Sequence, residues 1–264
     1  MCKVIAVCNQ KGGVAKTTTT VNLGIGLAGA GQRVLLIDND AQGSLTASLG
    51  IQDPDLLDYT LATVMGKIIN GEELKPEMGI IQHQEGIDLM PGNIELSGME
   101  LTLVGVMRRE FILAEYVERV RDKYDWILID CGPSLGMVTI NALAAADSVL
   151  IPVQVAYLPA KGLELLVKTV RKVINQKINP DLKIEGILLT MAVERTNYAK
   201  EIIRLIEEGY GNKVRIFEKM IPYTVRVGEC PAFGESIYKH EPKGKAAKAY
   251  RSLTLEIMDG GEHI

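Results

Sequence analysis

Short runs of consecutive apolar residues alternate along the chain with segments whose apolar residues recur every three or four positions. The first run, Val4 to Val7, is rich in β-branched residues and reads as a buried strand. Strands buried on both faces of a parallel sheet show such unbroken runs. Further strands are expected at Arg33 to Ile37, Ile87 to Met90, Trp126 to Asp130, the end of the segment 133–154, Ile184 to Thr190, and Val214 to Phe217 with Ile221 and Pro222.

The segments between these runs predict helices. Thr17 to Gly31 reads as a helix closed by two glycines. The stretch from Leu96 to Val120 has apolar residues at helical spacing and predicts one long helix or two, while Lys161 to Ile178 is amphipathic. Another helix is expected after Asn197 and a last one in the C-terminal tail. Prolines and glycines favour short helices and loops over residues 44–85.

Together these elements predict an α/β fold in which a mostly parallel central sheet has helices on both faces, in a single domain over residues 1–264. Hydrophobic residues make up 47% of the chain and aromatic residues 5%, so aliphatic side chains fill the core. No apolar run approaches the roughly 18 residues that a membrane span needs, and the four cysteines form no C-x-x-C pair. We therefore expect a cytosolic protein with reduced thiols and no membrane contact.

The net charge and His240 add little to this picture. The net charge of −4 does not suggest DNA, so any nucleic-acid contact must come from a local basic patch. The tail around His240 has several lysines that could extend such a patch, but no cysteine or second histidine lies near it in the sequence. We interpret His240 as a polar surface residue.

The stretch from Val4 to Thr20 combines a strand, a glycine turn and a helix start, which is the local order of a phosphate-binding loop. Backbone N–H groups and the positive end of a helix dipole cradle an anion there. Lys16 supplies a point charge, and the Thr17 hydroxyl is a ligand for Mg²⁺. The residues predicted to bind the nucleotide are Gly12, Gly13, Val14, Ala15, Lys16, Thr17 and Thr18.

Carboxylates follow two of the predicted strands. Asp38 and Asp40 come at the end of the strand from Arg33, and Asp130 ends the run from Trp126. Carboxylates at the carboxyl ends of strands beside a phosphate loop are placed to bind Mg²⁺ through water and to orient an attacking water. Each could instead be an ordinary turn residue, and only the combination with the loop makes the metal interpretation specific.

The loop does not match the general pattern G-x-x-x-x-G-K-[ST], because Gln10 and Ala15 occupy its glycine positions. It does match the variant K-G-G-x-x-K-T, whose additional lysine is Lys11. Here the chain resembles the ParA/MinD family of deviant P-loop (deviant Walker A) ATPases, and specifically the ParA-type (Soj-like) DNA-partition ATPases. The resemblance runs from Lys3 to about Tyr250 and is nearly residue for residue over 133–154.

The resemblance implies roles for individual residues. It implies that Lys11, Lys16 and Asp40 are catalytic, with Asp40 helping to activate water. Thr17, Asp38 and Asp130 would hold Mg²⁺, the backbone near Pro222 would line the adenine pocket, and Arg195 and Arg226 would contact DNA. Two departures from the family pattern stand out, since Ala41 replaces a proline of the D-x-D-P-Q-G switch and Tyr223 replaces an arginine.

The implied function is a nucleotide switch with a weak basal ATPase activity. ATP and Mg²⁺ let two subunits form a homodimer that binds nonspecific DNA of the nucleoid, and hydrolysis prompted by a ParB-like centromere-binding partner releases it as ADP forms. If position 15 requires a positive φ, its alanine costs roughly 1 to 2 kcal/mol, which corresponds to about a tenfold loss of nucleotide affinity.

Other functions stay open at the level of sequence. A MinD-like positioning ATPase needs an amphipathic C-terminal helix, to which the tail from Met258 is poorly suited. An iron protein of the same superfamily needs paired cysteines, and Cys131 has no evident companion. A nonhydrolysing, nucleotide-gated DNA-binding scaffold is kept open by Ala15 and Ala41.

Overall fold

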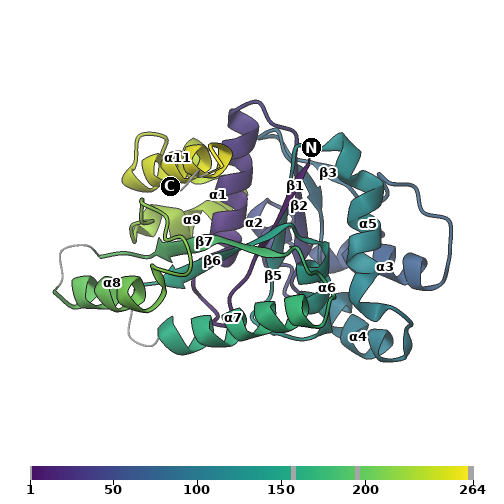
Figure 1. Cartoon of the computed structure of the whole chain (residues 1–264). Coiled ribbons are helices and arrows are strands. Elements are labelled where there is room, and N and C mark those ends of the chain that lie inside the picture. The colour runs from purple at the N-terminus through teal and green to yellow at the C-terminus, as the bar shows by residue number, and fades with distance from the viewer. Residues whose placement is uncertain (1, 156–158, 194–196, 261–264) are drawn as a thin grey trace.

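The computed structural model describes residues 2–155, 159–193 and 197–260, built around a seven-stranded sheet with the strand order β3-β4-β2-β5-β1-β6-β7 (Figure 1). All neighbouring strands are parallel except β3 and β4 at one edge. The fold class predicted from the sequence is therefore confirmed. The strands are β1 Lys3–Val7, β2 Val34–Asn39, β3 Ile81–Gln82, β4 Asp88–Met90, β5 Trp126–Cys131, β6 Ser148–Gln154 and β7 Lys183–Thr190.

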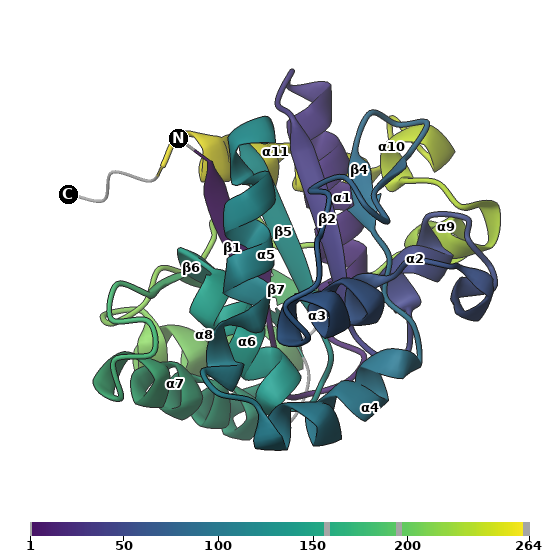
Figure 2. The same cartoon turned by 90° about the vertical axis from the view of Figure 1, so that its right-hand side faces the viewer.

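Helices cover both faces of this sheet. Figure 1 shows α1 and α11 on one side of the strands and α3 and α5 on the other, and Figure 2 looks onto the face covered by α5 and α6. The first face carries α1 Lys16–Gly29, α2 Ser44–Ser48, α9 Val225–Phe233, α10 Ile237–His240 and α11 Lys245–Met258. The second face carries α3 Leu61–Ile69, α4 Glu95–Thr102, α5 Ile112–Val120, α6 Met137–Ala145, α7 Pro159–Asn175 and α8 Asn197–Tyr210.

The side-chain alternation of the strands divides the core into two layers. On β1, Val4 and Ala6 pack into the layer under α3 to α8, whereas Ile5 and Val7 pack into the layer under α1 and α11. All four side chains are fully buried. A strand that must be apolar at every position cannot show the period of two, which is why the sequence presents an unbroken run here.

The structure decides one open alternative and overturns one predicted strand. The stretch 96–120 contains two α-helices, α4 and α5, because Arg108 between them has the left-handed φ of 54° and an α-helix cannot continue through it. The expected strand at 214–222 is wrong. Only isolated bridges join Ile216 to Ile187 and Pro222 to Ala192. Phe217 and Ile221, four residues apart, donate their N–H groups to Ile187 and Leu189, which are only two residues apart on β7, so extra residues interrupt the ladder.

Short 3₁₀ turns complete the described chain at Pro54–Leu56, Leu103–Gly105, Arg109–Phe111 and Arg121–Lys123. Among the described residues, no helix is both long enough and apolar enough to cross a bilayer. The parallel strands β1, β2, β5, β6 and β7 end at the same edge of the sheet, and the connections that leave this edge contain most of the candidate site residues.

Candidate functional site

The loop between β1 and α1 has the backbone shape of an anion cradle. Gly13 and Ala15 both have left-handed conformations, with φ of 68° and 66°. Gly12 and Gly13 are exposed, and a Cβ added to either would meet no other atom within 4 Å, so the space beside the loop is open. Alternating left-handed residues turn successive N–H groups toward one side, which is the arrangement that binds phosphate. The positive φ required of Ala15 is thus confirmed.

Neighbouring strand ends hold this loop in place. The Asn9 amide donates a hydrogen bond of 2.7 Å to the Pro152 carbonyl on β6, and its oxygen accepts one of 3.0 Å from the Lys11 N–H. Thr190, at the end of β7, donates its hydroxyl to the Val14 carbonyl at 3.0 Å. Sequence reasoning missed Asn9 and Thr190. The signal that could have found them is a polar residue at the end of a buried run.

The two lysines of the loop have different surroundings. Lys16 is buried, with 8% of its surface exposed, and its ammonium donates to the Lys11 carbonyl at 3.2 Å. The Lys11 ammonium instead lies 3.5 Å from the Gln154 side-chain oxygen, at the end of β6, and its side chain is only half-buried. The Lys16 side chain is therefore buried beneath the loop that contains it, whereas the Lys11 side chain lies half-buried at the end of β6.

The start of α1 contacts the end of β5 through hydroxyl groups. Thr17 donates a hydrogen bond of 2.7 Å to one carboxylate oxygen of Asp130, and Thr20 donates one of 3.1 Å to the other. Thr20 lies one helical turn after Thr17, so both hydroxyls face the same strand. The helical spacing of the threonines was the signal for Thr20, which sequence reasoning did not use.

Asp38 lies directly beside Asp130, because the two residues are paired in the register of β2 and β5. Both are buried, and burial raises the pKa of Asp130 to about 7, with Asp38 as the next cause. Burial likewise raises the pKa of Asp38 to about 6, although Thr46 donates its hydroxyl and its N–H to this carboxylate at 2.7 and 2.8 Å.

This donor set fits Mg²⁺. A cation beside two adjacent buried carboxylates would relieve the burial penalty that raises their pKa values. Hydroxyl and carboxylate oxygens are the ligands that Mg²⁺ prefers, and it is usually held by only one or two carboxylates together with phosphate oxygens and waters. The described residues contain no cluster of three or more acidic, cysteine or histidine side chains that could hold a metal, which agrees with a site of this open kind.

Asp40 lies in the segment after β2, close to the segment after β5. Its carboxylate accepts a hydrogen bond of 3.1 Å from the Gln42 N–H and is half-exposed. A Cβ on Gly132 would stand 3.1 Å from the same carboxylate, so the missing side chain lets the two segments approach. The structure therefore brings Asp40 to the loop that follows Asp130.

A second contact ties α4 to that loop. The Glu100 carboxylate accepts hydrogen bonds of 2.8 and 3.1 Å from the N–H groups of Met137 and Val138, in the first turn of α6. A Cβ on Gly136 would overlap this carboxylate. An acidic group at a helix N-terminus satisfies free N–H groups and the helix dipole. Sequence reasoning missed Glu100, because nothing in the local pattern links it to residues 37 positions later.

The residues predicted to line the adenine pocket and to contact DNA come from the C-terminal third of the chain. Pro222 lines a surface hollow of about 480 Å³ that Lys245 and Lys248 of α11 also line. Arg226 is on α9, where its side chain is 60% exposed and its guanidinium pairs with Glu229 at 3.0 Å. Arg195 lies outside the described residues.

A phosphate-binding loop after the first central strand, with a lysine and a threonine at the helix start and an aspartate on the adjacent parallel strand, defines the class of P-loop nucleotide-binding proteins. The sequence model of the family described as "AAA domain" matches residues 2–184. The chain belongs to the ParA-type (Soj-like) partition ATPases of the deviant P-loop group.

Named relatives support that membership over nearly the full length. The chain is 41% identical to the sporulation initiation inhibitor protein Soj of Bacillus subtilis, with 99% of this chain and 100% of the relative covered. It is also 41% identical to the chromosome partitioning protein ParA of Myxococcus xanthus, with 97% and 88% covered.

A solved structure matches the described fold closely. It is the crystal structure of cobyrinic acid a,c-diamide synthase from Mycobacterium smegmatis with bound ATP analog and magnesium. The two chains are 34% identical, with 99% of this chain and 96% of that chain covered, and the TM-score is 0.87.

Proposed function

We propose that this chain is an ATP-dependent DNA-partition ATPase that works as a single domain over residues 1–264 with ATP, ADP and Mg²⁺. The observation that carries the proposal is the 2.7 Å hydrogen bond from Thr17 to Asp130 beside the open phosphate loop. Further support comes from the partition proteins among its relatives and from a similar structure that holds an ATP analog and magnesium.

In this proposal the loop binds the nucleotide phosphates through its backbone. The N–H groups from Gly12 to Thr18 would donate hydrogen bonds to the phosphate oxygens, and Lys16 would turn from the Lys11 carbonyl toward them. The backbone at Pro222 borders the adenine. Because Pro222 is bridged to Ala192, two residues beyond the threonine that holds the loop, this wall of the pocket is tied to the phosphate end.

Thr17 and Asp130 would hold Mg²⁺, with Asp38 beside them, and the ion would neutralise charge on the phosphates. Asp40 would orient the attacking water, since its carboxylate is the half-exposed one of the three. Lys11 would complete the site of a second subunit in an ATP-bound homodimer. Its position at the rim, away from the lysine under the loop, supports a role across an interface.

The output of the cycle is DNA binding on the nucleoid. Arg226 and Arg195 would contact phosphates of nonspecific DNA in the ATP-bound dimer, and lysines of the basic helices would add to the attraction. Hydrolysis is slow in the protein alone and is accelerated by a ParB-like partner, after which the dimer separates and leaves the DNA.

A MinD-like membrane cycle has less support. Most apolar residues of α11 face the core beside α1, with Tyr250 and Leu253 fully buried, which leaves Leu255 as the exposed large apolar side chain of this helix. The nonhydrolysing scaffold is distinguished from the ATPase only by activity.

The deciding experiment measures phosphate release and DNA binding in parallel, with Mg²⁺-ATP, random-sequence duplex DNA and a ParB-like protein from the same genome. We expect slow release alone, faster release with DNA and partner together, and DNA retention in ATP but not in ADP. Lys16→Ala should lose both activities, whereas Lys67→Ala on α3 should keep both. ATP-gated DNA binding without phosphate release would point to the scaffold, and ATP-dependent binding to anionic vesicles to the MinD-like cycle.

A further inference from the structure

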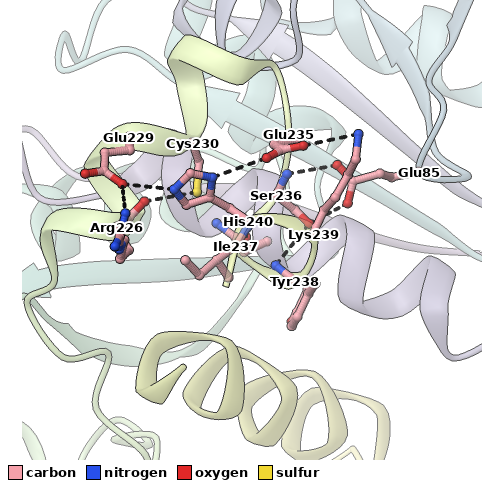
Figure 3. Close-up of polar contacts among 11 residues, drawn as sticks. Glu85, Arg226, Glu229, Cys230, Glu235, Ser236, Ile237, Tyr238, Lys239 and His240 are labelled. Carbon is pink, nitrogen blue, oxygen red and sulfur yellow. Dashed lines mark hydrogen bonds and ion pairs between the residues drawn. The ribbon is translucent and has the colours of Figure 1, made fainter. Parts of the chain in front are cut away.

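A group of charged side chains, here called the Glu229 cluster, surrounds Arg226 at the junction of α9 and α10 (Figure 3). One oxygen of Glu229 accepts a hydrogen bond from the Arg226 guanidinium and also lies within hydrogen-bonding distance of Nε2 of His240, each at 3.0 Å. Nδ1 of His240 lies 3.2 Å from Glu235, which also pairs with Lys239 at 3.1 Å. The cluster consists of Arg226, Glu229, Glu235, Lys239 and His240.

The ring of His240 is the inner member of this cluster. Its side chain is 13% exposed, against 37% for Glu229 and 60% for Arg226. The aromatic ring of Phe233 lies against it, with centroids 5.2 Å apart. Glu85, from the loop between β3 and β4, fixes the segment between the two helices by accepting hydrogen bonds from Ser236. The position of His240 is therefore set by packing, and the expectation of an ordinary surface histidine is corrected.

The geometry of the ring has a direct consequence for its protonation. Ionised carboxylates only accept hydrogen bonds, and both ring nitrogens of His240 face a carboxylate oxygen. Both contacts can be hydrogen bonds only when the ring is the doubly protonated imidazolium. In the neutral ring one nitrogen presents a lone pair to a carboxylate, which is repulsive.

Glu229 also competes with DNA phosphates for Arg226, the residue that we propose contacts DNA. A carboxylate and a phosphate bind the guanidinium of arginine through the same donors. A DNA phosphate can therefore bind Arg226 only by displacing the Glu229 carboxylate. A proton on His240 adds a second cation to the shared oxygen and repels the Arg226 guanidinium, so the hold on Arg226 weakens.

We propose that Glu229 and His240 form a proton-linked gate on Arg226, in which Glu229 retains the arginine when His240 is neutral and yields it to a DNA phosphate when His240 is protonated. The inference rests on the proposed DNA contact of Arg226. His240 is a positioning residue in it, since it acts only through Glu229. The other titratable or charged groups facing the cluster are Glu241 near Arg226, Glu85 on Ser236, Cys230 on the Arg226 carbonyl, and His83 on the Gly234 carbonyl.

The pKa of His240 decides the pH range in which this gate would act. Hydrogen bonding to Glu229 and then to Glu235 raises the pKa of His240 above its ordinary value, which is about 6.5. Hydrogen bonds from His240 first and from Arg226 second lower the pKa of Glu229, so this carboxylate remains ionised while the ring titrates. DNA affinity should therefore fall as the pH rises through neutrality.

The first test titrates the ATP-bound full chain with random-sequence duplex DNA at fixed salt. Glu229→Gln keeps the shape of the side chain but removes its charge, and should raise affinity about two- to fivefold, the range of a surface ion pair. Glu241→Gln removes an equal charge that makes no hydrogen bond to Arg226 and is the matched control. In an Arg226→Ala background the additional gain from Glu229→Gln should disappear.

The second test repeats the titration between pH 6 and 8, where DNA phosphates do not change charge. The natural chain should lose affinity by about two- to fivefold across this range, and His240→Gln should flatten the profile. His83→Gln removes the other described histidine, whose Nε2 lies 3.3 Å from the Gly234 carbonyl and which has no hydrogen bond to Glu229, and should leave the slope intact. Thermal unfolding of each variant checks that the fold is retained.

Distinct outcomes overturn distinct claims. If Arg226→Ala weakens DNA binding but Glu229→Gln and Glu241→Gln behave alike, the gate is wrong and the DNA contact stands. A pH slope that survives in His240→Gln also removes the gate. If ATP-dependent DNA binding is unchanged by Arg226→Ala, the proposed contact itself is misplaced and the gate falls with it.

Discussion

The hydroxyl of Thr17 donates a 2.7 Å hydrogen bond to the carboxylate of Asp130, across 113 positions of the sequence. Thr20 approaches the same carboxylate from the next turn of α1. The first turn of the helix and the end of β5 are thereby fixed relative to each other. A hydroxyl and a carboxylate held this close are the two groups with which the proposed Mg²⁺ site would begin.

Asp130→Asn should change how stability depends on pH. The pKa of Asp130 is raised in the folded chain to about 7, above the unfolded value of about 3.9. The folded state therefore holds more protons between these values, and stability falls as pH rises from about 4 to 7. In EDTA, the variant should be more stable than the natural chain at pH 8, by on the order of 1 kcal/mol or more, and the difference should vanish near pH 4.

Asp125→Asn is the matched control for that measurement, because its shift has the opposite sign. Arg33 lowers the pKa of Asp125 to about 2, so the natural carboxylate contributes stability above the unfolded pKa that is lost as pH falls toward the folded one. Its asparagine variant should be the less stable one at pH 8. Equal melting curves for Asp130→Asn and the natural chain at pH 8 would contradict the burial argument.

Ala15→Gly should relieve backbone strain. Ala15 has φ of 66°, where a side chain costs roughly 1 to 2 kcal/mol. Glycine should recover about 1 kcal/mol, divided between a higher melting temperature and a lower Kd for ADP with Mg²⁺ in calorimetric titration. Ala28→Gly, inside α1, makes the same chemical change in a right-handed helix and should lose about 0.5 to 1 kcal/mol. The same sign in both variants would show that the loop bears no strain.

Lys11→Ala should abolish ATP-dependent dimerisation while leaving the monomer folded. A cation supplied in trans to a transferring phosphoryl group contributes about 10³ to 10⁵ in rate. Sedimentation velocity with a nonhydrolysable ATP analogue and Mg²⁺ reads the dimer directly, with Lys67→Ala as a control of equal charge change. A normal dimer and normal hydrolysis in Lys11→Ala would reject the trans role.

Arg195→Ala and Arg226→Ala should each weaken DNA binding by the ATP-bound protein. For each variant the loss of affinity should be the same for every DNA sequence. Each phosphate contact removed should reduce the slope of log affinity against log salt by about one. Fluorescence anisotropy at several salt concentrations measures both quantities. An unchanged slope in the double variant would place the DNA surface elsewhere.

Glu100→Gln should loosen the loop after Asp130. The carboxylate accepts two N–H groups of α6, and loss of a charged helix cap costs about 1 kcal/mol. We expect a modest drop in melting temperature and a larger proportional drop in partner-stimulated phosphate release. Glu115→Gln, on the exposed surface of α5, should change neither. A fall in stability without any change in release would limit Glu100 to a structural role.

The sequence by itself determined the six parallel strands of the sheet, the phosphate loop and the carboxylates at strand ends, but not the two-residue edge strand β3, which lies in a stretch expected to contain short helices and loops. These features are local: a strand buried on both faces must be apolar at every position, and a phosphate loop needs glycine and a lysine within a few residues. The order of these motifs along the chain was therefore enough to predict the class of protein. The same local reasoning predicted a strand at 214–222, where extra residues between Phe217 and Ile221 interrupt the pairing with β7 and leave only isolated bridges.

Only the tertiary structure decided which distant groups meet. The pairing of Asp38 with Asp130 depends on the register of β2 with β5, and the hold of Thr190 on the loop depends on the position of β7. The place of His240 between two carboxylates likewise follows from the packing of α10 against α9. Burial and proximity set the pKa values and the charge competition at these sites. Both are properties of the folded arrangement, and no spacing in the sequence encodes them directly.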